Sequence, residues 1–237
     1  MNSGDPPSAS SWVAGVQRSR VSAALFADLA GRVPDRGDDR VLVAVDGVDG
    51  AGKTVFADQL AAATEALGRP VVRASVDDFH QPRAVRYRRG RDSPEGFWLD
   101  SYDYPALQQE LLEPLRNAAP VRLRWHDLAA DSQVDEPPVS VAPGAVVVID
   151  GLFLHRDELA DRWDLSIWLD VPFTVTAARM VSRDGSPADP DHPAMRRYVG
   201  GQQLYFAACS PWACADLVVD NTDWMLPRLL DRPPSDR

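Results

Sequence analysis

The chain has 237 residues, of which 45% are hydrophobic and 25% are charged, a composition typical of a globular protein with one sizeable core. Its 25 basic and 35 acidic residues give a net charge of −10, which argues against a nucleic-acid-binding surface and favours a small-molecule substrate. There is no apolar run of roughly 18 residues, no secretion-signal pattern, and only two cysteines, Cys209 and Cys214. We therefore expect a cytoplasmic protein that binds neither nucleic acid nor a membrane.

The first elements can be predicted from composition and spacing. Residues 1–12 are rich in serine, proline and glycine and are predicted to be disordered. Apolar residues at helical spacing predict a helix over residues 13–33. Val41–Val45 is a continuously apolar run, which is typical of a strand buried on both faces of a parallel sheet. Four later runs share this character: Val71–Val76, Ala145–Ile149, Leu165–Leu169 and Leu217–Val219.

Helical patterns separate these strands, at Lys53–Leu67, Ala106–Leu115, Thr174–Val181 and Pro193–Ala208. This alternation predicts an α/β fold, a doubly wound parallel sheet of about five strands with helices on both faces. We expect one domain over residues 13–237, with its core at about 40–222. Two segments interrupt the alternation, Gln81–Asp100 and Arg122–Val141, and are expected to be functional loops at the carboxyl ends of the strands.

The segment Gly47–Thr54 reads GVDGAGKT and matches the phosphate-binding loop, or P-loop, G-x-x-x-x-G-K-[ST]. It follows a predicted strand and opens a predicted helix, as the motif requires. Glycines there let backbone amides converge on a phosphate, the lysine reaches the β- and γ-phosphates, and the threonine hydroxyl binds Mg²⁺. We therefore predict that the nucleotide is bound by Gly47, Asp49, Gly50, Ala51, Gly52, Lys53, Thr54 and Val55.

Lys53 is the only lysine of the chain, since the other 24 basic residues are arginines. A chain that has arginine nearly everywhere else retains lysine where a compact, flexible ammonium is needed. This placement supports a role for Lys53 in catalysis as well as in binding.

Two further aspartates are predicted at strand ends. Val146–Gly151 is an apolar strand that ends in Asp150, the form of a Walker B element that holds Mg²⁺ together with Thr54; an Asp that caps the next helix is the alternative. The second strand is followed by Asp77 and Asp78, which should point opposite ways. Phosphoryl transfer to an alcohol needs an acceptor for the hydroxyl proton, and Asp77 is our candidate for it, with a turn-forming Asp pair as the alternative.

These motifs occur in the order seen in the uridine kinase and phosphoribulokinase family of P-loop NTPases. The segments are Gly47–Thr54, Ser75–Phe79, Ser101–Pro105, Asp150–Gly151 and Arg183–Asp184. Over roughly residues 40–222 the chain resembles uridine kinase most. The resemblance implies that Asp77 is the catalytic base and that Asp150 lies near Mg²⁺. It also implies that Asp103 binds ribose hydroxyls and that Gln202 contacts the substrate. For the lid, the resemblance implies that Arg183 contacts phosphates, with Arg179 as a further candidate.

The chain also departs from the family pattern. His80 replaces an aromatic residue and is a candidate for the acceptor pocket, Met180 stands where a lid arginine is expected, and Arg124–Asp127 lacks the residues that recognise a pyrimidine. Asp78–Pro82, with Gly96–Phe97, also resembles bacterial pantothenate kinase. We therefore expect a kinase that uses ATP or GTP and Mg²⁺ to phosphorylate a small molecule, a nucleoside first, pantothenate or another metabolite second. A regulatory ATPase without a small acceptor, and a homo-oligomer, remain open.

Two weaker signals remain. Five arginines between Arg83 and Arg91 form a basic cluster that could attract an anionic substrate or could be a solvated loop balanced by Asp92 and Glu95. Val199–Gln203, which reads VGGQQ, resembles the signature of transporter ATPases but follows the Walker B element instead of preceding it, so we discount that function.

Overall fold

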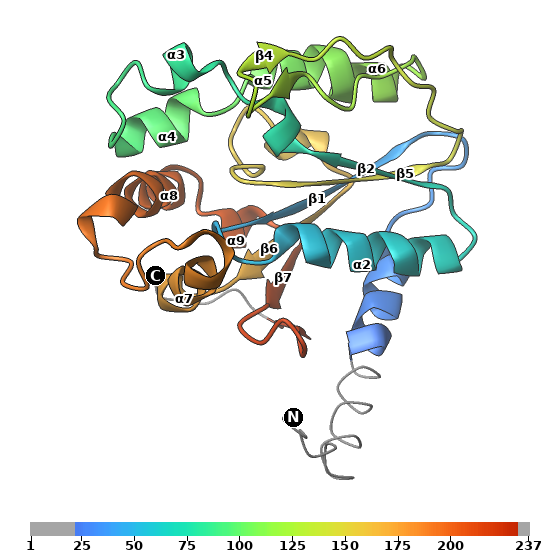
Figure 1. The fold of residues 1–237 in the computed structure, drawn as a ribbon. Helices are drawn as coiled ribbons and strands as arrows, with labels where there is room; N and C mark the ends of the chain where they lie inside the picture. Colours follow the sequence, from blue (N-terminus) through green and yellow to red (C-terminus); the bar gives the residue numbers. More distant parts are fainter. Residues whose placement is uncertain (1–21, 232–237) are drawn as a thin grey trace, which may run out of the picture.

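The computed structural model describes residues 22–231, and Figure 1 shows its central sheet. The sheet has six strands in the order β2-β5-β1-β6-β7-β8. All neighbouring pairs are parallel except β7 with β8. Its strands are β1 (Val41–Gly47), β2 (Val71–Ser75), β5 (Val146–Gly151), β6 (Leu165–Asp170), β7 (Leu217–Asp220) and β8 (Arg228–Leu229).

The predicted α/β class is confirmed, and each of the five predicted strands is found. The prediction of disorder at residues 1–12, and the start of the helix predicted from residue 13, lie outside the described residues.

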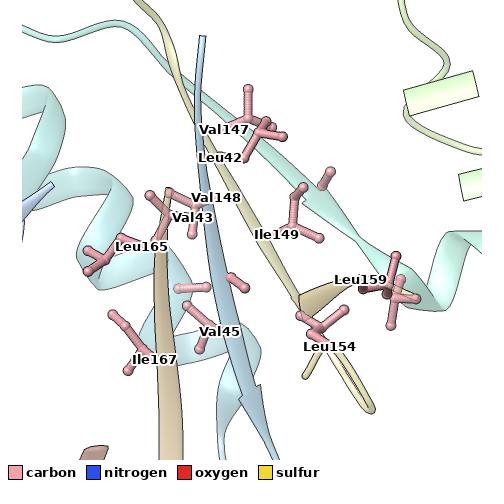
Figure 2. Close-up of a cluster of buried hydrophobic side chains, with 14 of the residues drawn as sticks. Leu42, Val43, Val45, Val147, Val148, Ile149, Leu154, Leu159, Leu165 and Ile167 are labelled. Carbon is pink, nitrogen blue, oxygen red and sulfur yellow. The ribbon is translucent and has the colours of Figure 1, made fainter. Parts of the chain in front are cut away.

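The middle of the sheet is the core of the molecule. Every residue of β1 and of β5 is buried. Val41 pairs with Val146 and Val43 with both Val148 and Leu165, so β1 lies between β5 and β6. Figure 2 shows apolar side chains of these three strands packed together. Burial on both faces explains why these strands read as unbroken apolar runs.

Helices cover both faces of this sheet. The main ones are α2 (Lys53–Ala66), α7 (Phe173–Asp184), α8 (Arg196–Cys209), α9 (Pro211–Cys214) and an N-terminal helix over residues 22–32. Figure 1 shows α2 on one side of the sheet and the α5–α6 region on the other. The N-terminal helix packs on α2 through Phe26 and Phe56, whose ring centroids lie 4.8 Å apart. None of the helices in residues 22–231 is long and apolar enough to cross a membrane.

The helix predicted over Ala106–Leu115 is not a regular α-helix. It consists of α5 (Tyr104–Ala106), a π-helical segment η2 (Leu107–Leu112) and α6 (Glu113–Arg116). Pro114 has no amide with which to bond the carbonyl of Glu110, and that carbonyl accepts the amide of Arg122 at 2.9 Å instead. The wider π-turn accommodates this diversion of the backbone.

The two segments predicted as loops contain regular structure, so that expectation was wrong in part. Gln81–Asp100 includes α3 (Arg83–Arg86) and α4 (Pro94–Asp100), and Arg122–Val141 includes a hairpin of β3 (His126–Asp127) and β4 (Ser132–Gln133). In the arginine cluster, Arg88 and Arg89 both bind the buried carboxylate of Asp100, at 2.5 and 2.9 Å. Asp100, and not Asp92, is therefore the main counter-charge of these two arginines.

The parallel register brings the predicted site residues to one edge of the sheet. Asp150 of β5 pairs with Val45 of β1 on one side and with Ser75 of β2 on the other. The P-loop leaves β1 at Gly47, and the short helix η1 (Val76–Phe79) follows β2 directly. A Cβ atom at Gly151 would collide with the Val76 side chain, which explains the glycine at this crossing.

Candidate active site

The P-loop is shaped by two glycines with left-handed backbone. Gly50 has φ +77° and Gly52 has φ +88°, a conformation that side-chain-bearing residues rarely adopt. Asn221, just after β7, donates from Nδ2 to the carbonyl of Ala51 at 2.7 Å. No side chain caps the N-terminus of α2. The first amides of this helix therefore remain available for an anion, which the helix dipole also favours.

The predicted metal ligands lie against each other. Thr54 Oγ1 donates to Asp150 Oδ2 at 2.7 Å, and Arg73 Nη2 donates to Asp150 Oδ1 at 2.8 Å. Asp150 is 3% exposed, and these two bonds hold its buried carboxylate in position. A hydroxyl and a carboxylate side by side fit Mg²⁺, which usually takes one or two protein oxygens and completes its shell with phosphate and water.

A cavity of about 320 Å³ opens above the P-loop. Its lining comes from the loop, α2, η1, β5 and α7: Asp49, Gly50, Gly52, Lys53, Thr54, Val55, Asp77, Asp150, Arg179, Met180 and Arg183. Most of the residues predicted for the nucleotide and metal are thus in one place. Gly47 and Ala51 belong to the same loop but are buried and do not line the cavity.

Asp77 and Asp78 have different surroundings. Asp77 lines the cavity, and Tyr102 donates its hydroxyl to Asp77 Oδ1 at 2.8 Å. Asp78 points to Arg124, whose Nε lies 3.3 Å from its carboxylate. Burial raises the pKa of Asp78, and the Arg124 guanidinium offsets this only in part. Of these two aspartates, only Asp77 therefore lines the cavity above the P-loop.

His80 and Asp103 are not among the residues that line this cavity. His80 Nδ1 donates to the Asp77 carbonyl at 2.7 Å, and its ring lies 4.5 Å from that of Tyr102. Burial lowers the pKa of His80, which favours the neutral ring. Asp103 Oδ1 accepts the amide of Ala106 at 3.0 Å and caps α5. A contact of either residue with the acceptor stays a prediction.

The two arginines predicted for the lid have different partners. Arg183 is 55% exposed and pairs with Asp49 at 3.2 Å and Asp184 at 2.9 Å. Arg179 donates to the carbonyls of Gly50, Ala51, Asn221 and Thr222. Arg179 thus joins α7 to the loop, whereas Arg183 is held only by solvent-accessible ion pairs and is free to turn toward a phosphate.

A second cavity of about 240 Å³ adjoins the first, and sequence reasoning missed it. It is lined by Phe26, Gly52, Val55, Phe56, Gln59, Arg179, Asn221 and Trp224. Gly52, Val55 and Arg179 line both cavities. Phe26 and Trp224 lie near opposite ends of the chain and outside any motif, so no local pattern could have paired them.

Gln202 lies in neither cavity. It is a buried residue of α8 whose Oε1 accepts the Asp49 amide at 2.7 Å and whose Nε2 donates to the Tyr198 carbonyl at 2.9 Å. Both ends of its amide are thus bonded to the protein. The substrate contact that the resemblance implies for Gln202 stays untested.

Known proteins are similar to this chain in sequence. Uridine kinase from Shewanella piezotolerans is 28% identical over 152 residues, which cover 61% of this chain and 68% of that protein. Uridine kinase from Deinococcus deserti is 27% identical over 149 residues, 60% and 68% of the two chains.

Two solved structures of kinases, one putative and one possible, are similar to this chain in fold. A putative fructose transport system kinase from Silicibacter sp. TM1040 is 29% identical, with a TM-score of 0.67 over 83% of this chain and 98% of that one. A possible uridine kinase from Bacillus stearothermophilus has the same TM-score of 0.67 at 23% identity, over 84% and 97% of the two chains, and shows the shared fold.

The sequence model of the Phosphoribulokinase / Uridine kinase family matches residues 42–188. This match spans more than half of the chain and includes the P-loop, Asp77, Asp150 and Arg183. The chain therefore belongs to the Phosphoribulokinase / Uridine kinase family and is a phosphotransferase that acts on a hydroxyl group.

Proposed function

We propose that this kinase transfers the γ-phosphoryl group of ATP to the 5′-hydroxyl of a nucleoside, with Mg²⁺ as its metal ion. The observation that carries the proposal is the position of the Asp77 carboxylate in the same cavity as Lys53 and Thr54. Phosphoryl transfer to an alcohol needs a proton acceptor opposite a bound triphosphate, and this arrangement provides one.

The phosphates of the nucleotide lie on the P-loop in this proposal. The free amides at the start of α2 and the Lys53 ammonium hold the β- and γ-phosphates. Lys53 Nζ rests 3.0 Å from the Val48 carbonyl, a neutral partner that it can leave without breaking an ion pair. Arg183 turns from Asp49 to the transferred group and neutralises its charge.

Asp77 orients the acceptor hydroxyl and removes its proton as the oxygen attacks. The Tyr102 hydroxyl holds Asp77 Oδ1, so Oδ2 is the oxygen that faces the acceptor. Thr54 and Asp150 hold Mg²⁺, which when bound neutralises charge on the β- and γ-phosphates. Arg73 keeps the Asp150 carboxylate aimed at this position.

The nucleotide base occupies the second cavity. Arg179 and Trp224 line it, and both can stack on a purine. The Asn221 amide nitrogen is bonded to the Ala51 carbonyl, and the Arg179 guanidinium is bonded to four carbonyls. Because these polar groups are already bonded to the protein, they would contact a base through its shape more than through hydrogen bonds to its polar edge. Adenine and guanine would then be poorly distinguished, so GTP remains an alternative donor to ATP.

The acceptor could instead be another metabolite with a free hydroxyl, pantothenate or a sugar. The relative at 29% identity is described as a putative fructose transport system kinase, which favours testing sugars. Arg124–Asp127, the stretch that would recognise a pyrimidine, lies beside the proposed catalytic base Asp77. The Trp125 amide donates to the carbonyl of the next residue, Asp78, at 2.9 Å. Its side chains differ from those of uridine kinases, so the acceptor must be identified by assay.

The test is release of ADP from ATP·Mg²⁺ in the presence of uridine, cytidine, pantothenate or fructose. Asp77→Asn should lower acceptor-dependent turnover by about 10²- to 10⁴-fold while leaving ATP affinity nearly unchanged. Asp78→Asn, on the adjacent residue that faces Arg124, is the matched control and should keep most of the turnover. ADP release at the same rate with and without every acceptor would favour a regulatory ATPase and overturn the proposal.

A further inference from the structure

The glutamine of the VGGQQ segment is bonded to the P-loop. Gln202 Oε1 accepts the amide of Asp49, the third residue of the motif, at 2.7 Å. Asp49 directly precedes Gly50, where the backbone turns left-handed. The loop thus donates one hydrogen bond to a helix far along the chain, at the residue before its first left-handed glycine.

A second residue of α8, Tyr205, is hydrogen-bonded to β1, the strand that leads into the loop. The Tyr205 hydroxyl donates to Asp46 Oδ2 at 2.6 Å, and Asp46 Oδ1 accepts the Gly47 amide at 2.7 Å. Gln202 and Tyr205 are three residues apart and therefore lie on the same face of α8. Both are buried, so α8 holds the end of β1 and the loop through two protected hydrogen bonds.

The amino-terminal half of α8 is fixed to the segment that contains α3 and α4. A Cβ atom at Gly201 would lie 2.8 Å from both Phe97 Cδ1 and the Pro94 carbonyl, so the glycine allows α4 to approach closely. Arg197 is buried and donates to the carbonyls of four residues around α3 and α4: Arg86, Gly90, Arg91 and Ser93. One helix thus connects the Arg83–Asp100 segment to the P-loop.

We infer that Gln202 is a positioning residue of the P-loop, through which α8 holds the nucleotide site and the Arg83–Asp100 segment as one unit. Both polar ends of its side chain are already bonded to Asp49 and Tyr198, and it lines neither cavity. Loss of the bond to Asp49 frees the loop before nucleotide arrives, and ordering the loop on binding then costs affinity. The inference rests on the proposed binding of nucleotide phosphates by this loop.

The test compares Gln202→Met with Gln203→Met. Methionine keeps the length of the side chain but neither donates nor accepts the two amide hydrogen bonds, and Gln203 is an exposed neighbour on the same helix. We expect Gln202→Met to weaken ATP·Mg²⁺ and ADP binding about three- to tenfold in calorimetry, with the KM for the acceptor unchanged. Gln203→Met should bind like the wild type.

Hydrogen exchange gives a second readout. In the nucleotide-free protein, backbone amides of residues 47–52 should exchange faster in Gln202→Met than in Gln203→Met, while the strands of the sheet keep wild-type protection. A thermal unfolding scan verifies that both variants fold. Unchanged nucleotide affinity in folded Gln202→Met, or a raised acceptor KM with unchanged nucleotide affinity, would overturn the inference.

Failure of the inference about Gln202 can be distinguished from failure of the proposed kinase function. Nucleotide binding and loop exchange are measured without an acceptor, so a wild-type protein that binds ATP but phosphorylates none of the tested alcohols still tests Gln202. A wild-type protein that binds no nucleotide would overturn both. A competent kinase whose Gln202→Met variant binds ATP normally would overturn the inference alone.

Discussion

Three carboxylates at the edge of the sheet differ in what their oxygens already bind. Both oxygens of Asp150 accept hydrogen bonds, from Thr54 and Arg73. Asp78 is paired with Arg124 and partly buried. Asp77 has one oxygen bonded to Tyr102 and lies exposed in the cavity. A general base must have an oxygen within reach of the acceptor, so this difference favours Asp77 over its neighbours.

His80 allows a test of side-chain burial beside Asp77. Because its folded pKa is lowered below the usual value of 6.5, mainly by burial, protonation of His80 opposes folding. The penalty is absent well above pH 6.5 and grows as the pH falls through that value toward the folded pKa.

His80→Gln retains a polar side chain but does not titrate. We expect the difference in unfolding free energy between the wild type and this variant to shift in favour of the variant as the pH falls from 7.5 to about 5. Urea unfolding of both proteins across this range measures it. His192→Gln, at an exposed histidine, is the control. A difference that does not vary with pH would contradict the expected burial of His80.

The residues of the site could be predicted where one short motif determines them. The sequence placed Lys53, Thr54, Asp77 and Asp150 near one another because P-loop and strand-end positions converge in any sheet of this topology. It missed Phe26 and Trp224, since the second cavity, of about 240 Å³, arises from packing between distant segments. It also could not show that Gln202 is bonded to Asp49, because that contact depends on the position of α8.

Among the elements, the buried strands were the most predictable, because burial on both faces leaves an unbroken apolar run. The two-residue strands β3, β4 and β8 were missed, since so few residues carry no periodicity. The π-helical segment was also missed, because it depends on the diversion of the Glu110 carbonyl to Arg122. Elements that depend on long-range hydrogen bonds thus escaped prediction from local patterns.

The close packing of α4 against α8 can be tested by a substitution at Gly201. In Gly201→Ala the added methyl group would be forced against Phe97 and the Pro94 carbonyl, and we expect a loss of about 1–3 kcal/mol in unfolding free energy. Gly31→Ala is the matched control, because Gly31 is helical and has nothing within 4 Å of an added Cβ. That variant should gain up to about 1 kcal/mol from helix propensity. Equal effects in denaturant unfolding would show that the two helices are not closely packed.

At the scale of the whole molecule, charge constrains how a nucleotide can bind. The chain has a net charge of −10, and the cavity above the loop holds Asp49, Asp77 and Asp150 as well as Lys53, Arg179 and Arg183. Local cations therefore only balance local carboxylates, and a triphosphate would add about four negative charges at neutral pH. Strong binding should need the loop amides, the ammonium and a divalent cation together.

Nucleotide-induced stabilisation tests this requirement without knowledge of the acceptor. ATP with Mg²⁺ at about 100 times its Kd should stabilise the fold by about 2.7 kcal/mol and raise the unfolding midpoint by about 5–10 °C. We expect most of this shift to vanish in EDTA, and in Lys53→Met even with Mg²⁺ present. Arg32→Met removes a positive charge from the exposed Arg32–Asp28 pair and should retain the full shift. A Lys53→Met protein stabilised as much as the wild type would mean that the triphosphate is not bound on the P-loop.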